Sequence, residues 1–166
     1  MLNNITDAAY SDEWYTTQET VDIAIKLLDP APQSLILCPF DSAHSLFVKT
    51  LQDMEHTVAY GFDNFITGDF RHCDYIITNP PFSIKDKVIE RVYEYGVKTV
   101  LILPVDALGG VKRHKLYKYY GYPSVYVPTK RVAYVDELGN LRKGANFHSV
   151  IMTFNQGPSS DLVWES

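Results

Sequence analysis

Short apolar segments alternate with helical segments along most of the chain, and this alternation limits the available folds more than any other feature. Runs such as LILC and TVLIL suit strands, and their near-continuous hydrophobicity indicates burial on both faces. The order of the segments is typical of an α/β protein with a mostly parallel, doubly wound sheet. The expected strands are 34–38, 56–62, 72–78 and 98–105, and the expected helices are 17–28, 43–54 and 84–95.

The last third of the chain has a different pattern. After Gly109-Gly110, the basic stretch VKRHKLYKYYG has helical character, and β-rich segments follow at 124–135 and 146–154. The residues between these segments, DELGNLRKGA, have the turn chemistry of a loop. We therefore expect a C-terminal antiparallel hairpin that completes the sheet.

The composition suits a single globular domain over residues 1–166. The 46% hydrophobic and 21% charged residues argue against disorder and allow a sizeable core. No apolar run reaches the roughly 18 residues of a membrane span, and the N-terminal residues do not resemble a signal peptide. Cys38 and Cys73 lack the spacing of a metal site, so we expect no metal and a reducing, cytoplasmic location.

Charge is distributed unevenly along the chain. The net charge of −5 argues against broad, nonspecific binding of nucleic acid, and residues 1–60 hold nine acidic and two basic side chains. Residues 111–146 instead hold eight basic and two acidic side chains. Two interpretations stay open for this basic region: a local face for phosphate groups, or a lysine-rich surface that is only solvated.

The most informative motif is TNPPFS, which follows the expected strand 72–78. Asn79 precedes a proline and is therefore held in extended geometry, while Pro80 and Pro81 stiffen the turn. The side-chain carbonyl of Asn79 and the main-chain carbonyl of Pro80 suit an amine with two hydrogens, and Phe82 offers a face for a planar base. In open α/β sheets, ligands bind at the carboxyl ends of strands, where this motif is expected.

The stretch DYIITNPPF resembles motif IV of the amino-methyltransferases that use S-adenosylmethionine, specifically those that methylate the exocyclic amine of adenine in DNA. The resemblance implies a Rossmann-like methyltransferase fold, S-adenosylmethionine as cofactor, DNA as partner and no metal. It also implies that Asn79 and Pro80 accept hydrogen bonds from the target amine and that Phe82 stacks on the flipped base, with Pro81 completing the motif. Catalysis would then be mainly positioning. An RNA or protein amine as acceptor stays open.

Other stretches resemble the same family and concern the cofactor. DEWYTT resembles motif X, which implies that Tyr15 and Thr16 touch the methionine end of the cofactor. GDF resembles the Asp-Phe pair that the family places against the cofactor's adenine, which implies that Asp69 accepts from the adenine amine and Phe70 packs on the ring. Asp63, after the second expected strand, is the candidate for the ribose.

Motif I departs from the family pattern. The family usually has Asp/Glu-Pro-x-x-Gly-x-Gly after the first strand, whereas this chain has CPFDSAH, in which Pro39 is kept and Cys38 replaces the acidic residue. Two interpretations stay open. Asp41 takes over the acidic role and contacts the amino group of the cofactor. Alternatively, the cofactor site is degraded, and the chain is a catalytically inactive methyltransferase-fold protein that binds nucleic acid or a host protein.

The chain has no room for a separate target-recognition domain, so residues 106–146 are the expected region of nucleic-acid contact. In size and motifs, the chain looks similar to short methyltransferase-like proteins encoded by phages and prophages. Its oligomeric state stays open. The candidate phosphate contacts are Lys112, Arg113, Lys115, Lys118, Lys130, Arg131, Arg142 and Lys143.

Overall fold

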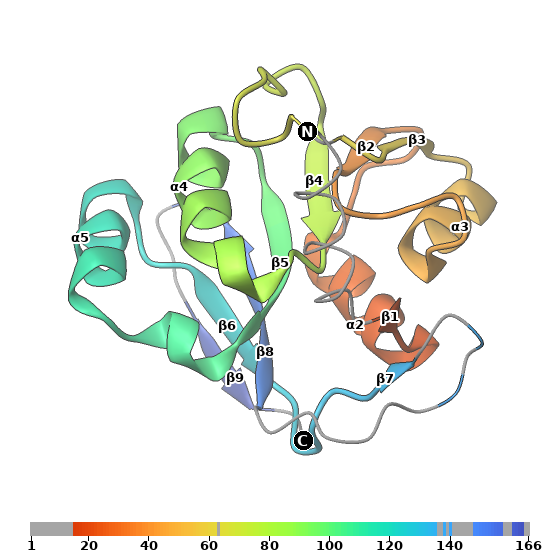
Figure 1. Ribbon diagram of the computed structural model, residues 1–166. Helices are drawn as coiled ribbons and strands as arrows, with labels where there is room; N and C mark the ends of the chain where they lie inside the picture. The colour runs from red at the N-terminus through yellow and green to blue at the C-terminus, as the bar shows by residue number, and fades with distance from the viewer. Residues whose placement is uncertain are drawn as a thin grey trace, which may run out of the picture.

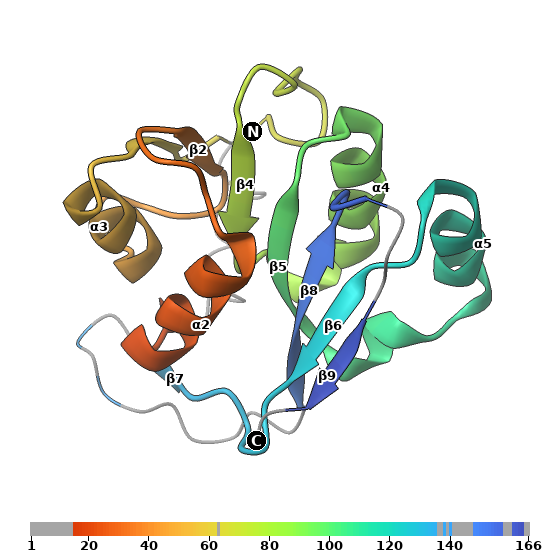
Figure 2. The same cartoon turned by 180° about the vertical axis from the view of Figure 1, so that it is seen from behind.

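A seven-stranded sheet with helices on both faces forms the body of the molecule (Figure 1, Figure 2). The computed structural model describes residues 15–62, 64–135, 138, 140, 148–157 and 161–164. Within them, the strands of this sheet follow the order β3-β2-β4-β5-β8-β6-β9. Their bounds are β2 Leu35–Cys38, β3 Thr57–Tyr60, β4 Tyr75–Thr78, β5 Thr99–Pro104, β6 Ser124–Val127, β8 Ser149–Phe154 and β9 Leu162–Trp164.

The strand directions confirm the predicted architecture. Strands β3, β2, β4 and β5 are parallel, whereas β8 lies antiparallel between β5 and β6. At the edge, β9 runs parallel to β6. The two longest strands, β5 and β8, are buried at every residue and form the centre of the sheet. Their continuous apolar sequences, TVLILP and SVIMTF, fit strands that are covered on both faces.

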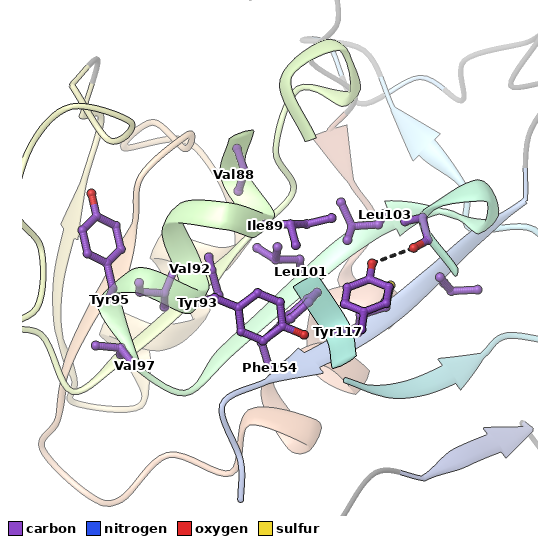
Figure 3. Close-up of a cluster of buried hydrophobic side chains, with 14 of the residues drawn as sticks. Val88, Ile89, Val92, Tyr93, Tyr95, Val97, Leu101, Leu103, Tyr117 and Phe154 are labelled. Atoms are coloured by element: carbon purple, nitrogen blue, oxygen red, sulfur yellow. Dashed lines mark hydrogen bonds between the residues drawn. The ribbon is translucent and has the colours of Figure 1, made fainter. Parts of the chain in front are cut away.

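Helices α2 and α3 cover one face of the sheet, and helices α4 and α5 cover the other (Figure 1, Figure 2). On the first face, Val21 and Leu28 of α2 belong to the same core cluster as Ile77 of β4. On the second face, Tyr93 of α4 and Tyr117 of α5 lie around the end of β8 (Figure 3). The bounds are α2 Gln18–Leu28, α3 Leu46–Asp53, α4 Lys85–Tyr95 and α5 Val111–Tyr120.

The segment expected as one strand at 124–135 divides into two. Its first part is β6, and Pro128 then ends the strand because proline has no N–H for the ladder. Its last part, β7 (Tyr134–Val135), pairs antiparallel with β1 (Tyr15–Thr16) in a separate two-stranded sheet. The predicted hairpin therefore consists of β6 and β8, and residues 136–147 between them lie largely outside the described part of the chain.

The connection between β3 and β4 uses aromatic side chains where other crossovers use a helix. The ring of Phe65, which is 1% exposed, packs against Phe70 at 5.8 Å and Tyr95 at 5.3 Å between ring centroids. Arg91 of α4 donates to the carbonyl oxygen of Gly68 at 2.7 Å. In both cartoon views, this connection passes over the end of β4 opposite its arrowhead (Figure 1, Figure 2). The aromatic rings thus complete the core on the α4 side of the sheet.

Candidate functional site

The carboxyl ends of β2 and β4 bring two of the predicted motifs together. These strands are parallel neighbours, with Leu37 opposite Ile76, so their carboxyl ends lie at the same edge of the sheet. The residues CPFD continue from β2 and the residues NPPF continue from β4. A hydrogen bond joins the two segments directly, between Thr78 and Asp41, which are 37 residues apart in the chain.

Asp41 is held by hydroxyl groups from two different elements. Its Oδ2 accepts from Thr78 Oγ1 at 2.9 Å, and its Oδ1 accepts from Ser45 Oγ at 2.7 Å. Burial raises the pKa of Asp41 from 3.8 to about 6, while the hydrogen bonds from Ser45 and Thr78 act in the opposite direction by stabilising the ionised form. A partly buried carboxyl group with a strongly raised pKa, placed at the carboxyl edge of a sheet, is typical of a functional site.

The turn that replaces the glycine-rich motif is closed by main-chain hydrogen bonds. The N–H of Asp41 donates to the carbonyl of Cys38 at 3.2 Å, and the N–H of Phe62 donates to the carbonyl of Pro39 at 2.9 Å. Cys38 is 0% exposed and belongs to the core, where burial raises the pKa of its thiol. The side chain of Cys38 is therefore a core group. Asp41 and the exposed His44 are the other ionisable residues of this turn, and Asp41 is the one that bonds to β4.

Ser45 fixes where the turn ends and α3 begins. Its side chain is the N-cap of α3 and accepts from the N–H of Phe47 at 3.2 Å. The helix consequently starts at Leu46, three residues later than the 43–54 expected from apolar spacing. Because the same hydroxyl donates to Asp41, the helix cap and the acidic group are tied to each other.

The NPPF segment forms the rigid turn that its two prolines predict. Pro80 and Pro81 are buried, whereas Asn79 and Phe82 are partly exposed. Pro81 has φ −56° and ψ 126°, and a single 3-10 turn, Phe82–Ile84, follows before α4 begins. The turn therefore keeps Asn79 at the carboxyl end of β4, next to Thr78.

Thr16 and Asn79 meet at this edge although 63 residues separate them. Asn79 Nδ2 donates to Thr16 Oγ1 at 3.5 Å, the long limit for such a bond. Thr16 lies in β1 opposite Tyr134 of β7, and the hydroxyl of Tyr134 hydrogen-bonds Ser149 Oγ at 2.5 Å. The structure thus brings the motif X residue Thr16 to NPPF. Tyr15 pairs with β7 through its main chain.

A strap, residues 128–133, links β6 to β7 along the same edge. His148 Nε2 hydrogen-bonds the carbonyl of Pro128 at 3.0 Å, and the carbonyl of His148 accepts from the N–H of Val105 at 2.8 Å. Figure 1 shows this link below the arrowheads of β6 and β4, where it runs towards β1. The exposed residues Lys130 and Arg131 lie on the strap, close in sequence to the β1–β7 pair.

The residues predicted to hold the cofactor's adenine have structural contacts. Asp69 accepts from Arg71 Nη2 at 2.6 Å and from Arg71 Nε at 2.9 Å, and this pairing lowers the pKa of Asp69. Phe70 packs on Phe65 in the connection between β3 and β4. The contacts described for both residues are within that connection and with α4, and neither Asp41 nor Asn79 is among them. The adenine role of Asp69 and Phe70 stays a prediction, and Asp63 lies outside the described residues.

Most of the predicted phosphate contacts are exposed, but Arg113 is engaged within the protein. Arg113 donates to Asp86 Oδ1 at 2.6 Å and to the carbonyls of Asp106 and Gly109, also at 2.6 Å each. Its guanidinium therefore links the start of α5 to α4 and to the 3-10 turn Val105–Leu108 that follows β5. Arg142 and Lys143 lie outside the described residues. The exposed cations are Lys112, Lys115, Lys118, Lys130 and Arg131.

Two of the groups that shape this edge, Thr78 and Ser45, were not among the residues predicted from the sequence. A signal existed in each case. Thr78 is a hydroxyl residue at the end of an apolar strand, and Ser45 stands directly before a helical run, where a cap is common. Among the described residues, no group of three or more His, Cys, Asp and Glu side chains could hold a metal ion, and no helix has the length and hydrophobicity to cross a membrane.

No family model matches the chain, and no curated protein matches its sequence. Solved structures do match its fold. A modification subunit of a putative type I restriction enzyme from Vibrio vulnificus YJ016 superposes with a TM-score of 0.56 at 15% identity, over 99% of this chain and 49% of that one. The 23S rRNA methyltransferase ErmE gives 0.58 at 12% identity, over 93% and 73%. The M protein of the type I restriction enzyme EcoKI gives 0.54 at 11%, over 86% and 44%.

These similarities establish the fold, which is the Rossmann-like methyltransferase fold that the motifs predicted. The chain spans about half the length of the Vibrio subunit. At identities of 11–15%, the similarity extends to the arrangement of strands and helices, and the site must be argued from the residues of this chain.

Proposed function

We propose that this protein transfers a methyl group from S-adenosylmethionine to the exocyclic amine of adenine in DNA. One observation carries the proposal: the NPPF turn leaves the carboxyl end of a central parallel strand, directly beside the ionisable carboxyl group of Asp41. In this fold class, that edge is where ligands bind. The NPPF turn, the proposed binding site of the target base, and an acidic group are thus side by side at the same edge.

The residues at the edge fit S-adenosylmethionine. When bound, this cofactor supplies an activated methyl group on a positively charged sulfonium, and its methionine end carries an ammonium. Asp41, ionised above about pH 6, is the anionic partner for the ammonium. Thr16 approaches from β1 with a hydroxyl group at the same edge. Pro39 shapes the turn next to Asp41 through its carbonyl bond to Phe62.

The NPPF turn is suited to hold the target base. Its prolines are buried, so the main chain is fixed before any ligand binds. The amide nitrogen of Asn79 faces Thr16, and the carbonyl oxygen of the same amide is buried in the turn. That carbonyl and the carbonyl of Pro80 are the proposed acceptors for the target amine, and the partly exposed ring of Phe82 is the proposed stacking surface. The protein's contribution is therefore alignment.

A second candidate function is a methyltransferase-fold protein that binds nucleic acid or a host protein without catalysis. The observation that favours it is the turn from Cys38 to Ser45, which has no glycine and in which the carboxylate of Asp41 is already bonded to two hydroxyl groups. RNA is a further acceptor class to test, because one of the matching folds is a 23S rRNA methyltransferase.

Calorimetric titration with S-adenosylmethionine, followed by transfer of a radiolabelled methyl group to DNA and to RNA, separates these candidates. Asn79→Ala is expected to keep the cofactor affinity within about threefold and to lower the methyl-transfer rate about a hundredfold or more, because it removes an acceptor for the target amine. Asp69→Ala is expected to weaken cofactor binding if Asp69 holds the adenine. Ser83→Ala, at an exposed position of the same turn, is the matched control.

Three outcomes are decisive. Absence of binding at millimolar cofactor would contradict the enzyme and favour the second candidate. Binding with transfer to RNA alone would change the substrate and keep the reaction. A large loss of cofactor affinity in Asn79→Ala would contradict the role assigned to Asn79.

A further inference from the structure

Thr78 is a hydroxyl-bearing residue where an apolar one would be expected. It ends the strand YIIT, is 0% exposed, and follows Ile76 and Ile77, which are also fully buried. Valine has nearly the same shape and would suit this strand equally well or better. Burying a hydroxyl group also costs free energy unless the group is hydrogen-bonded. The packing alone therefore does not explain threonine at this position.

The partner of the hydroxyl group supplies the explanation. Thr78 Oγ1 donates to Asp41 Oδ2 at 2.9 Å, while Ser45 Oγ donates to the other carboxylate oxygen at 2.7 Å. The carboxylate of Asp41 therefore accepts one hydrogen bond from the last residue of β4 and one from the N-cap residue of α3. Two donors aimed at the same carboxylate both fix its direction and favour its ionised form.

Thr78 is also the residue that precedes Asn79. The side chain of Thr78 bonds to the proposed cofactor residue, and its main chain continues into the proposed target residue, which in turn contacts Thr16. The end of β4 thus contacts both the proposed cofactor residue, Asp41, and the proposed target residue, Asn79. Because β4 lies between β2 and β5 in the sheet, the position of this strand end is fixed by neighbours on both sides.

We propose that Thr78 is a positioning residue that holds Asp41 ionised and correctly directed for the ammonium group of S-adenosylmethionine, and so couples the cofactor half of the site to the target half. This inference rests on the proposed function. Thr78 acts through Asp41 and Asn79 and does not itself contact the reacting atoms.

The coupling has a consequence for the pH dependence of the site. Without the Thr78 donor, the ionised form of Asp41 loses a favourable hydrogen bond, so the pKa of Asp41 rises further above 6. The other groups described around Asp41 are Ser45, which donates to it, and the buried thiol of Cys38, whose own pKa is raised by burial and by Asp41. The thiol stays neutral in the range where Asp41 titrates. His44 belongs to the same turn and is exposed, so the titration of Asp41 is followed at its own carboxyl carbon.

The test uses two readouts on the purified protein with all 166 residues. The first is the titration of the Asp41 carboxyl carbon by NMR, without cofactor, between pH 4 and pH 8. The second is calorimetry with S-adenosylmethionine between pH 5 and 7.5, where the ammonium of the cofactor remains mostly protonated. The variants are Thr78→Val, which removes the hydroxyl group, and Thr78→Ser, which keeps it. Thr99→Val is the control, since Thr99 is equally buried but bonds the carbonyl of Val97 at the start of β5.

The expected result is an upward shift of the Asp41 midpoint by about one pH unit in Thr78→Val, with a parallel shift of the pH at which cofactor affinity rises. At pH 6.5, affinity is expected to fall about threefold, because the ionised fraction of Asp41 falls from about three quarters to about one quarter. Thr78→Ser is expected to restore both midpoints, and Thr99→Val to leave them unchanged. Asp41→Asn is expected to abolish the pH dependence of binding over this range.

Failure of the proposed function and failure of the role of Thr78 would give different results. If the wild-type protein does not bind the cofactor at any pH, the proposed function fails, whatever the NMR titration shows. If the wild type binds, but Thr78→Val has the wild-type midpoint in both readouts, the role of Thr78 is wrong and the proposed function stands. Equal shifts in Thr78→Val and Thr99→Val would also overturn the inference, because they would reflect a general loss of packing.

Discussion

The ionised form of Asp41, which the proposed function requires, is also the form that destabilises the folded protein, because the carboxyl group is buried. Its carboxyl group is partly buried between β2, α3 and β4, and burial raises its pKa to about 6. The unfolded chain, with a pKa near 3.8, ionises more readily than the folded protein. Between these two values the folded state binds the proton more tightly, so the free energy of unfolding falls as the pH rises from about 4 to about 6.

Replacing Asp41 with asparagine is therefore expected to stabilise the protein at neutral pH. Since one pKa unit corresponds to about 1.4 kcal/mol, Asp41→Asn should raise the free energy of unfolding at pH 8 by about 1–3 kcal/mol. Near pH 4 the difference should fall to about 0.5 kcal/mol, because Asp41 is then protonated in the folded state and about half protonated in the unfolded chain. Urea unfolding at pH 4, 6 and 8 measures this, with the exposed Asp53→Asn as control. Equal effects at all pH values would contradict the buried-carboxylate account.

At the scale of elements, the connection between β3 and β4 shows how a segment without a helix can cover a sheet. Phe65 and Phe70 pack with Tyr95, and Arg91 bonds the main chain of Gly68 and stacks on Tyr95 with 4.6 Å from the guanidinium carbon to the ring centroid. The chain must approach the ring of Phe70 closely for this arrangement. A Cβ at Gly68 would lie 2.7 Å from that ring and 3.0 Å from the carbonyl oxygen of Asn64.

Gly68→Ala is consequently expected to be destabilising by about 1–3 kcal/mol, because an added methyl group overpacks the aromatic cluster. Chemical denaturation followed by far-UV circular dichroism measures the loss. The control is Gly109→Ala, where a Cβ meets nothing within 4 Å and the main chain is extended. A variant at Gly68 as stable as the one at Gly109 would show that the connection is loosely packed.

At the scale of the whole molecule, the basic residues divide into two functional groups. The protein has a net charge of −5, yet α5 carries three exposed lysines and one arginine and no acidic residue. Arg113 has a side chain that is only 17% exposed, and it joins α5 to Asp86 of α4. Lys115, on the same helix, is exposed to solvent. Arg113 therefore stabilises the fold, whereas Lys115 remains a predicted phosphate contact.

Single substitutions should separate these groups. Arg113→Ala is expected to lower the free energy of unfolding by about 1–3 kcal/mol, because Asp86 and two carbonyls lose their donor. Lys115→Ala should leave stability within about 0.5 kcal/mol. Under the proposed function, Lys115→Ala should also weaken DNA binding and reduce the salt dependence of affinity by about one charge. Fluorescence anisotropy at several salt concentrations measures this, and an unchanged slope would exclude Lys115 from the interface.

The alternation of strands and helices, the parallel core and the stiff NPPF turn at a strand end could all be predicted from local sequence. These features depend on local quantities: hydrophobic spacing, and the restriction that proline places on its own φ and on the preceding residue. They hold whatever the distant parts of the chain do, and the fold confirms the architecture built from them.

The partners of the side chains could not be predicted in this way, because they depend on tertiary contacts. Asp41 bonds to Thr78, 37 residues away in the chain, and Asn79 bonds to Thr16, 63 residues away. Arg113 is only partly exposed because it bonds to Asp86, 27 residues away. The division of 124–135 into β6 and β7 likewise depends on a pairing with β1 at the other end of the chain. Such contacts are set by which strand ends share an edge of the sheet, and spacing along the sequence does not contain that information.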